Sequence, residues 1–262
     1  MRRFIFLIVP IFFIPLFGFS GKGIYLTAES AILMDPISKK IIYSKNPHKK
    51  LAPASTVKIM TALIALKKAD LKKEVVISGL AASMEPSKIY IKKGEVYLLE
   101  DLVKAALLNS GNDASVAIAE GVAGSHERFV KMMNQMVYSL GARNTNFKNS
   151  TGLPSKNQYT TAYDLALIVR AAMRESYFNE VIRTAQTEIK ELRSGRIIKL
   201  RNHNKALWKD TPYSIYVKTG YTRKARHCFA GYIEYKNKKR IVVILKSKKP
   251  WQDLEVLARG GF

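Results

Sequence analysis

The chain has only one cysteine, Cys228, among its 262 residues. A single thiol cannot form an intrachain disulfide, so the fold depends on its core and not on a disulfide framework. Residues 228–233 (CFAGYI) form an apolar run typical of a buried strand. We therefore expect Cys228 to be a packing residue and not a reactive one.

The sequence also lacks the patterns of metal sites and of the hydrolase nucleophile elbow. Its four histidines, His48, His126, His203 and His227, are scattered without metal-ligand spacing. No G-x-S-x-G segment is present. We therefore disfavour a zinc peptidase and interpret the histidines as structural or surface residues.

Acidic residues are scarce, with 20 Asp and Glu against 44 Lys and Arg, for a net charge of +24. Such an excess favours anionic partners by long-range attraction, and nucleic acid, lipid headgroups and anionic cell-wall polymers all qualify. Hydrophobic residues make up 47% of the chain and prolines number only 9. This composition is typical of one compact domain with a substantial core.

The N-terminus indicates a compartment. Met1-Arg2-Arg3 precedes an uncharged run over residues 4–19 that contains two prolines. We interpret residues 1–20 as a secretory signal peptide, with an uncleaved membrane anchor as the alternative. Export to the periplasm, or to the outer face of the cytoplasmic membrane or the cell wall, disfavours nucleic acid as a partner.

The pattern of apolar residues predicts strands at both ends and helices between them. Residues 31–34 and 41–43 flank a turn and read as a hairpin. Helices are expected over residues 56–69, 99–108, 113–122, 126–140, 162–175 and 251–258. Strands are expected over residues 215–217, 228–235 and 240–245. The fold class is therefore α/β of the α+β type, with one sheet from both termini packed against a helical region.

Ser55-Thr56-Val57-Lys58 is the first candidate for chemistry. A spacing of three residues on a helix puts Ser55 and Lys58 on one face. A serine hydroxyl needs a base to take its proton, and a lysine serves as that base only when burial or a second cation keeps it neutral. An S-x-x-K segment alone is equally consistent with an ordinary helix cap.

Two further triplets are candidates for the same site. Ser110-Gly111-Asn112 lies in the break between two predicted helices and reads either as a turn or as a hydroxyl and an amide facing a cleft. Lys218-Thr219-Gly220 follows a short predicted strand. A cation and a hydroxyl there suit a carboxylate, and glycine lets a ligand approach the backbone closely.

In this order the three motifs resemble those of penicillin-binding proteins and serine β-lactamases. The sequence around these motifs is most similar to that of the low-molecular-mass D-alanyl-D-alanine carboxypeptidases of peptidase family S11. The similarity extends from about residue 25 to the end. The matching stretches are residues 51–61 (LAPASTVKIMT), 110–114 (SGNDA), 149–154 (NSTGLP), 161–166 (TAYDLA), 202–204 (NHN) and 218–222 (KTGYT). The resemblance implies the penicillin-binding fold and removal of the terminal D-alanine from peptidoglycan stem peptides, with β-lactams as inhibitors.

The resemblance implies no metal or organic cofactor, and it also implies roles for individual residues. Ser55 would be the acylated nucleophile, Lys58 its general base, and Ser110 a proton relay. The residues implied in substrate binding are Asn112, Lys218, Thr219, Gly220 and Tyr221, the last through its backbone N–H in an oxyanion hole that it shares with Ser55.

Two departures from the family pattern stand out. Arg226 occupies a position where the family usually has glycine. The chain also ends where the peptidase domain is expected to stop, so residues 21–262 are expected to be that domain without a second one. We expect its charge to replace a missing anchor.

Three alternatives remain at this point. A β-lactamase of class A type would need an E-x-x-x-N loop, which only Glu175 and Asn179 match, at an unexpected position. A D,D-endopeptidase that cleaves cross-links shares the motifs. A basic protein that only binds the cell wall is the non-enzymatic alternative.

Overall fold

The computed structural model describes residues 25–262, and the predicted signal peptide lies outside this range. One antiparallel sheet of five strands, in the order β2-β1-β9-β8-β7, is built from both ends of the chain. Its strands are β1 (Ser30–Met34), β2 (Ile41–Lys45), β7 (Ser214–Thr222), β8 (Arg226–Tyr235) and β9 (Lys238–Ser247). The predicted sheet from both termini is confirmed, and β7 forms one of its edges.

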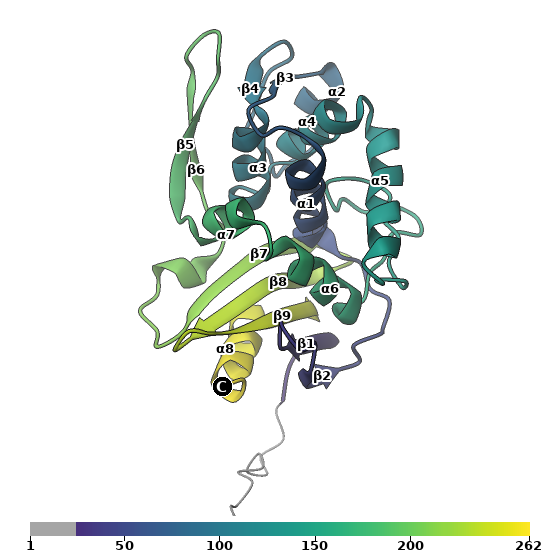
Figure 1. Cartoon of the computed structure of the whole chain (residues 1–262), viewed down its shortest axis with the longest axis vertical. Coiled ribbons are helices and arrows are strands. Elements are labelled where there is room, and N and C mark those ends of the chain that lie inside the picture. Colours follow the sequence, from purple (N-terminus) through teal and green to yellow (C-terminus); the bar gives the residue numbers. More distant parts are fainter. Residues whose placement is uncertain (1–24) are drawn as a thin grey trace, which may run out of the picture.

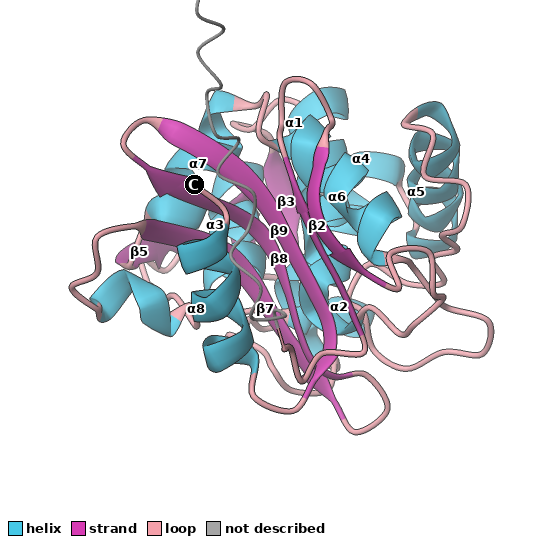
Figure 2. Cartoon of the chain, turned by 90° about the horizontal axis from the view of Figure 1, so that it is seen from below, coloured by secondary structure: helices cyan, strands magenta, loops and turns pink. Residues whose placement is uncertain are grey.

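Alternation along the strands gives the sheet two apolar faces. On β9, Ile241 and Val243 belong to the larger core cluster, whereas Val242 and Ile244 belong to the smaller one. The larger cluster packs against the helical region, and the smaller one packs against α8 (Pro250–Gly260). Figures 1 and 2 show the sheet between these two layers.

The helical region contains the predicted helices with small differences at their ends. Its long helices are α1 (Lys58–Lys68), α3 (Leu99–Leu108), α4 (Asn112–Ala123), α5 (His126–Ser139) and α6 (Ala162–Ala172). A 3-10 turn, η1 (Ala54–Val57), precedes α1, so the expected start of this helix at residue 56 is wrong by two residues. The helix expected over residues 162–175 also ends early, and α7 (Ser176–Arg183) follows as a separate helix.

Several short elements were not predicted. They are α2 (Gly79–Ala82), the ribbon of β3 (Glu74–Val76) and β4 (Val96–Leu98), the hairpin of β5 (Gln186–Lys190) and β6 (Ile197–Arg201), and the 3-10 turn η2 (Lys205–Trp208). The β5–β6 hairpin runs alongside the helical region, away from the main sheet (Figure 1).

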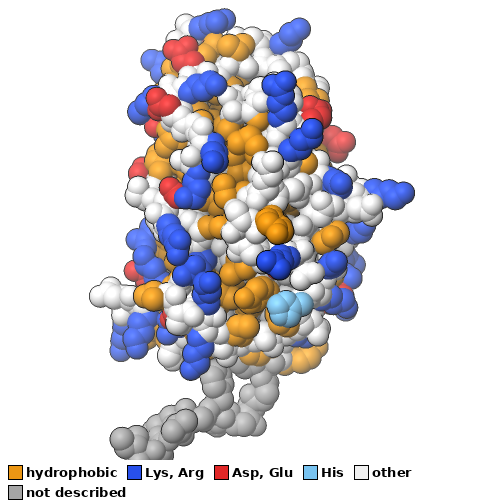
Figure 3. Space-filling view, turned by 45° about the vertical axis from the view of Figure 1, so that its right-hand side comes forward, with side chains coloured by type: hydrophobic (Ala, Val, Ile, Leu, Met, Phe, Trp, Pro, Cys, Tyr) orange, Lys and Arg blue, Asp and Glu red, His pale blue; other side chains and the backbone are white. Residues whose placement is uncertain are grey.

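The surface reflects the charge of the chain. Figure 3 shows one face on which lysine and arginine side chains are spread widely and outnumber the acidic ones. Among residues 25–262, no helix is both long enough and apolar enough to cross a membrane. Cys228 is fully buried in β8, and burial raises the pKa of its thiol to about 12, so its predicted packing role is confirmed.

Candidate active site

Ser55 lies in the tight η1 turn immediately before α1. The preceding residue, Ala54, has a left-handed backbone (φ 49°), which is unusual for a residue with a side chain. Lys58 begins α1 and is completely buried, and its Nζ lies 3.0 Å from Ser55 Oγ. The structure therefore brings together the serine and the lysine that the sequence predicts as a pair.

Two other groups contact the same amine. Lys58 Nζ donates to Asn112 Oδ1 at 2.7 Å and to the backbone carbonyl of Thr151 at 2.6 Å. Both of these oxygens can only accept hydrogen bonds, so they use the two hydrogens of a neutral amine. The nitrogen lone pair is then left for the Ser55 hydroxyl, which is the arrangement that a general base needs.

Burial and a neighbouring cation favour this neutral amine. Burial, together with the charge of Lys218, holds the pKa of Lys58 well below its usual range, while Asp113 acts weakly in the opposite direction. Lys218 is also buried, and the loss of hydration lowers its pKa to about 7. Burial thus disfavours the charged ammonium form of both lysines.

The second motif lies at the junction of α3 and α4, as predicted. Ser110 takes a left-handed backbone (φ 60°) and lines the same cleft as Ser55. Asn112 is fixed from two sides, because its backbone N–H donates to Ser87 O at 2.7 Å and its Nδ2 donates to Glu85 O at 2.9 Å. These bonds orient Oδ1 toward Lys58.

The third motif lies on the edge strand β7. The Lys218 amine contacts the Thr219 carbonyl at 2.9 Å. Gly220 lies directly against the nucleophile turn, since a Cβ added there would be 2.8 Å from the backbone nitrogen of Ser55. Only glycine allows the strand to pass so close. Tyr221 follows and is 52% exposed.

All three motifs meet in one cleft of about 340 Å³. Ser55, Ser110, Asn112, Thr219, Gly220 and Tyr221 line it, while Lys58 and Lys218 lie buried beneath its surface. The remaining lining residues are Pro86, Ser87, Gly152, Leu153, His203, Lys205, Thr222, His227, Phe229 and Trp251. Within residues 25–262, no cluster of His, Cys, Asp or Glu side chains is placed to hold a metal.

Two histidines without a predicted role in the site, His203 and His227, line this cleft. Burial lowers the pKa of His203 to about 4, and the charges of Lys218 and Lys58 act in the same direction. Residues 202–204 are one of the stretches that match the family, but the sequence assigned no role to His203. Arg226 has a left-handed backbone (φ 53°) and is exposed, outside the residues that line the cleft.

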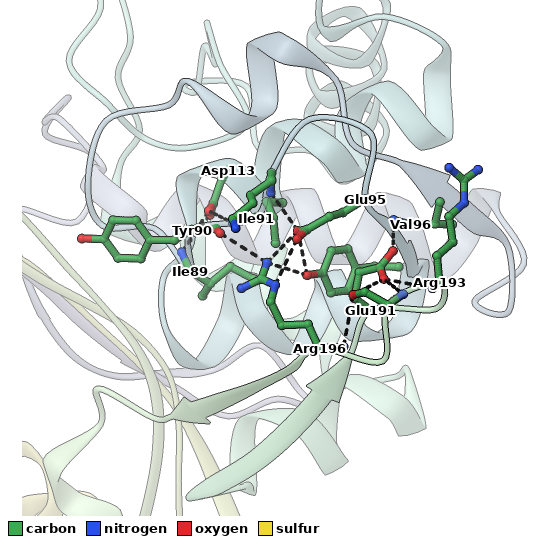
Figure 4. A network of polar contacts seen from close by, with 12 residues as sticks. Ile89, Tyr90, Ile91, Glu95, Val96, Asp113, Glu191, Arg193 and Arg196 are labelled. Atoms are coloured by element: carbon green, nitrogen blue, oxygen red, sulfur yellow. Dashed lines mark hydrogen bonds and ion pairs between the residues drawn. The ribbon is translucent and has the colours of Figure 1, made fainter.

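A polar network that the sequence did not indicate holds the segment that follows Pro86 and Ser87, two of the residues that line the cleft. Arg196, next to β6, forms two bonds with Glu95 (Nε to Oε1, 3.0 Å; Nη2 to Oε2, 2.6 Å) and a longer one with the Tyr90 carbonyl. On the other side of this segment, Asp113 accepts from the backbone N–H of Ile89 at 3.0 Å (Figure 4). The network joins the hairpin to the segment that also carries Ser87 and Glu85.

The sequence model of the D-alanyl-D-alanine carboxypeptidase family, Peptidase_S11, matches residues 20–249. D-alanyl-D-alanine carboxypeptidase DacF of Bacillus subtilis is 36% identical over 228 residues, which cover 85% of this chain and 58% of that protein. DacC of Escherichia coli is 32% identical, over 90% of this chain and 61% of that protein. The chain thus spans about three-fifths of the length of these relatives.

Solved structures show the same fold. A D-alanyl-D-alanine carboxypeptidase from Mycobacterium tuberculosis aligns with a TM-score of 0.84 and 27% identity, over 91% of this chain and 92% of that one. A mutant of the Streptomyces K15 DD-transpeptidase aligns with a TM-score of 0.83 and 25% identity, over 90% and 98% of the two chains. The chain has the penicillin-binding fold and belongs to the D-alanyl-D-alanine carboxypeptidase family, peptidase S11.

Proposed function

We propose that this chain is a serine D-Ala-D-Ala carboxypeptidase that removes the terminal D-alanine from peptidoglycan stem peptides. The observation that carries the proposal is the contact of the buried Lys58 amine with Ser55 Oγ at 3.0 Å, while the same amine is held by Asn112 Oδ1 and the Thr151 carbonyl. Residues 21–262 form the proposed peptidase domain. No cofactor enters the mechanism.

In the proposed first step, Lys58 Nζ takes the proton of Ser55, and Oγ attacks the carbonyl carbon of the penultimate D-alanine. The backbone N–H groups of Ser55 and Tyr221 stabilise the negative charge that forms on the carbonyl oxygen. Gly220 supports this assignment, because its lack of a side chain lets β7 approach the nitrogen of Ser55.

The leaving D-alanine carries the terminal carboxylate, which we assign to Lys218 and Thr219. Ser110, which lines the same cleft, relays a proton to the departing amine. Asn112 contacts Lys58 through Oδ1 and positions the substrate beside it. Water then hydrolyses the ester on Ser55, and β-lactams acylate the same oxygen.

A labelled penicillin tests this proposal. We expect the wild type to be labelled and to release D-alanine from a D-Ala-D-Ala pentapeptide, while Ser55→Ala does neither. Ser139→Ala, which changes an exposed serine at the end of α5, is the matched control and keeps both activities. Labelling of Ser55→Ala, or an unlabelled wild type, would contradict the mechanism.

A class A β-lactamase is disfavoured by the position of its required pair. Glu175 immediately precedes α7 and forms an ion pair with Lys67, and the Asn179 side-chain amide donates to the Glu175 backbone carbonyl. Neither Glu175 nor Asn179 lines the cleft. The matching E-x-x-x-N spacing is therefore explained as local helix structure.

The pH dependence of kcat/KM follows from the two lysines. The base must be neutral, so activity is lost as pH falls through the lowered pKa of Lys58. The carboxylate-binding Lys218 must be charged, so activity is also lost as pH rises through about 7. We expect a bell-shaped profile. A substrate with an amide in place of the terminal carboxylate should lack the alkaline limb, and an identical limb for both substrates would refute the assignment of Lys218.

The family acts on the cell wall, and we propose that this chain is exported and held there by its charge. Anionic wall polymers or the membrane surface would attract a protein with 44 basic and 20 acidic residues (Figure 3). Attraction of this kind is screened by salt. We expect moderate salt to move the protein from the wall and membrane fraction to the soluble fraction, whereas retention that does not respond to salt would rule out the charge as the anchor.

A further inference from the structure

The cleft does not end at the carboxylate-binding pair. It continues around the open edge of β7 to the opposite face of the sheet, where four aromatic side chains line it: Tyr221, His227, Phe229 and Trp251. We call these four residues the aromatic recess. The mechanism proposed above uses none of their side chains.

Strand geometry connects the recess to the site. Lys218 and Gly220 face the helical region, so the residue between them, Thr219, faces α8. Thr219 lies directly opposite Phe229 across the β7–β8 pair, and Tyr221 lies opposite His227. A group held by the Thr219 hydroxyl therefore lies at the entrance of the recess.

The rings form two stacked pairs. The ring centroids of Tyr221 and His227 are 4.7 Å apart, and those of Phe229 and Trp251 are 4.5 Å apart. Trp251 comes from the first turn of α8, so three separate elements build the recess. No acidic side chain from residues 25–262 lines the cleft, which suits a ligand with an apolar body and a carboxylate.

We propose that the aromatic recess binds the side chain of the leaving D-residue and that it favours side chains longer than the methyl group of alanine. This inference rests on the proposed function, in which the leaving residue places its carboxylate at Thr219. A methyl group would leave most of an aromatic recess unfilled, whereas an aliphatic chain would cover the rings. Such a chain is present where the leaving residue continues into a second peptide, as at a cross-link.

The chemistry stays the same for the longer leaving group. Ser55 Oγ forms an ester with the D-alanine carbonyl carbon while the C–N bond to the leaving residue breaks. The departing nitrogen takes a proton and carries away its carboxylate and side chain, and water then hydrolyses the ester. The recess thus directs the same site toward endopeptidase cleavage.

The test compares two peptides that differ only in the leaving residue, ending in D-Ala-D-Ala and in D-Ala-D-norleucine. The measured quantity is the ratio of kcat/KM for the norleucine peptide to that for the alanine peptide. Norleucine adds three methylenes to the alanine side chain, and apolar pockets discriminate by about tenfold or more per methylene, so we expect a ratio of at least about ten in the wild type. In Trp251→Ala the ratio should fall to about one, and Trp251→Phe should retain most of it.

Trp208→Ala is the matched control, because this second tryptophan lies in η2, is 47% exposed, and is absent from the cleft lining. Its ratio should equal that of the wild type. The fraction of correctly folded protein is measured for each variant by penicillin labelling. A wild-type ratio of one or less, or a ratio that Trp251→Ala does not change, would overturn the inference. Failure of the proposed function is distinct, because penicillin labelling and cleavage of the alanine peptide would then be absent altogether.

Discussion

Lys58→Met is expected to slow acylation of Ser55 by about 10²- to 10⁴-fold, the usual contribution of a positioned general base. Methionine has a similar length and no basic nitrogen, so Ser55 keeps its place but loses the group that takes its proton. The measurement is the second-order rate of labelling by penicillin. The acid limb of the pH profile should disappear with the amine.

Lys68→Met is the control, because Lys68 lies at the other end of α1 and is exposed. It should acylate at the wild-type rate. The Lys58 variant leaves Thr151 O and Asn112 Oδ1 without their buried donor, at a cost of about 1–3 kcal/mol for each unpaired group. Part of this cost is offset because an ionisable group is no longer buried. A folded Lys58→Met protein that is acylated within tenfold of the wild-type rate would show that the base is another group.

Most of the long elements could be predicted because each has its own apolar period. The residues of α3 were predicted without error, and β8 and β9 were found within two residues at each end. Short elements gave no such signal. Within strands β5 and β6, only Ile189 and Leu200 are buried, so the strands show too few buried apolar positions for their alternation to stand out.

The sequence predicts those parts of the candidate site whose chemistry depends on side chains. Serine, lysine and asparagine in recognisable triplets indicated the cleft, but the third partner of Lys58 is the backbone carbonyl of Thr151. A carbonyl is present at every residue, so no sequence pattern distinguishes this one. The aromatic recess was also hidden, because Tyr221, Phe229 and Trp251 come from three elements that meet only in the fold.

Gly152→Ala is expected to destabilise the protein and to disable the nucleophile together. Gly152 has a left-handed backbone (φ 84°), and a Cβ there would run into the Ala54 carbonyl and lie 3.0 Å from the nitrogen of Ser55. The positive φ costs about 1–2 kcal/mol and the overpacking about 1–3 kcal/mol. We expect a loss of about 2–5 kcal/mol in the free energy of unfolding, measured by denaturant titration.

The same substitution should slow penicillin acylation of the folded protein by about a hundredfold. The Ala54–Ser55 peptide must shift to admit the methyl group, and a displacement of about 1 Å in a reacting group costs this much. Gly141→Ala is the control that distinguishes backbone strain from steric clash. Gly141 also has a positive φ (77°), but a Cβ there meets nothing within 4 Å. It should lose only about 1–2 kcal/mol and acylate normally. Equal losses in the two variants would mean that contact with Gly152 does not set the position of Ser55. A larger loss in Gly152→Ala, together with slower acylation, would show that the chain beneath the nucleophile turn is part of the catalytic geometry.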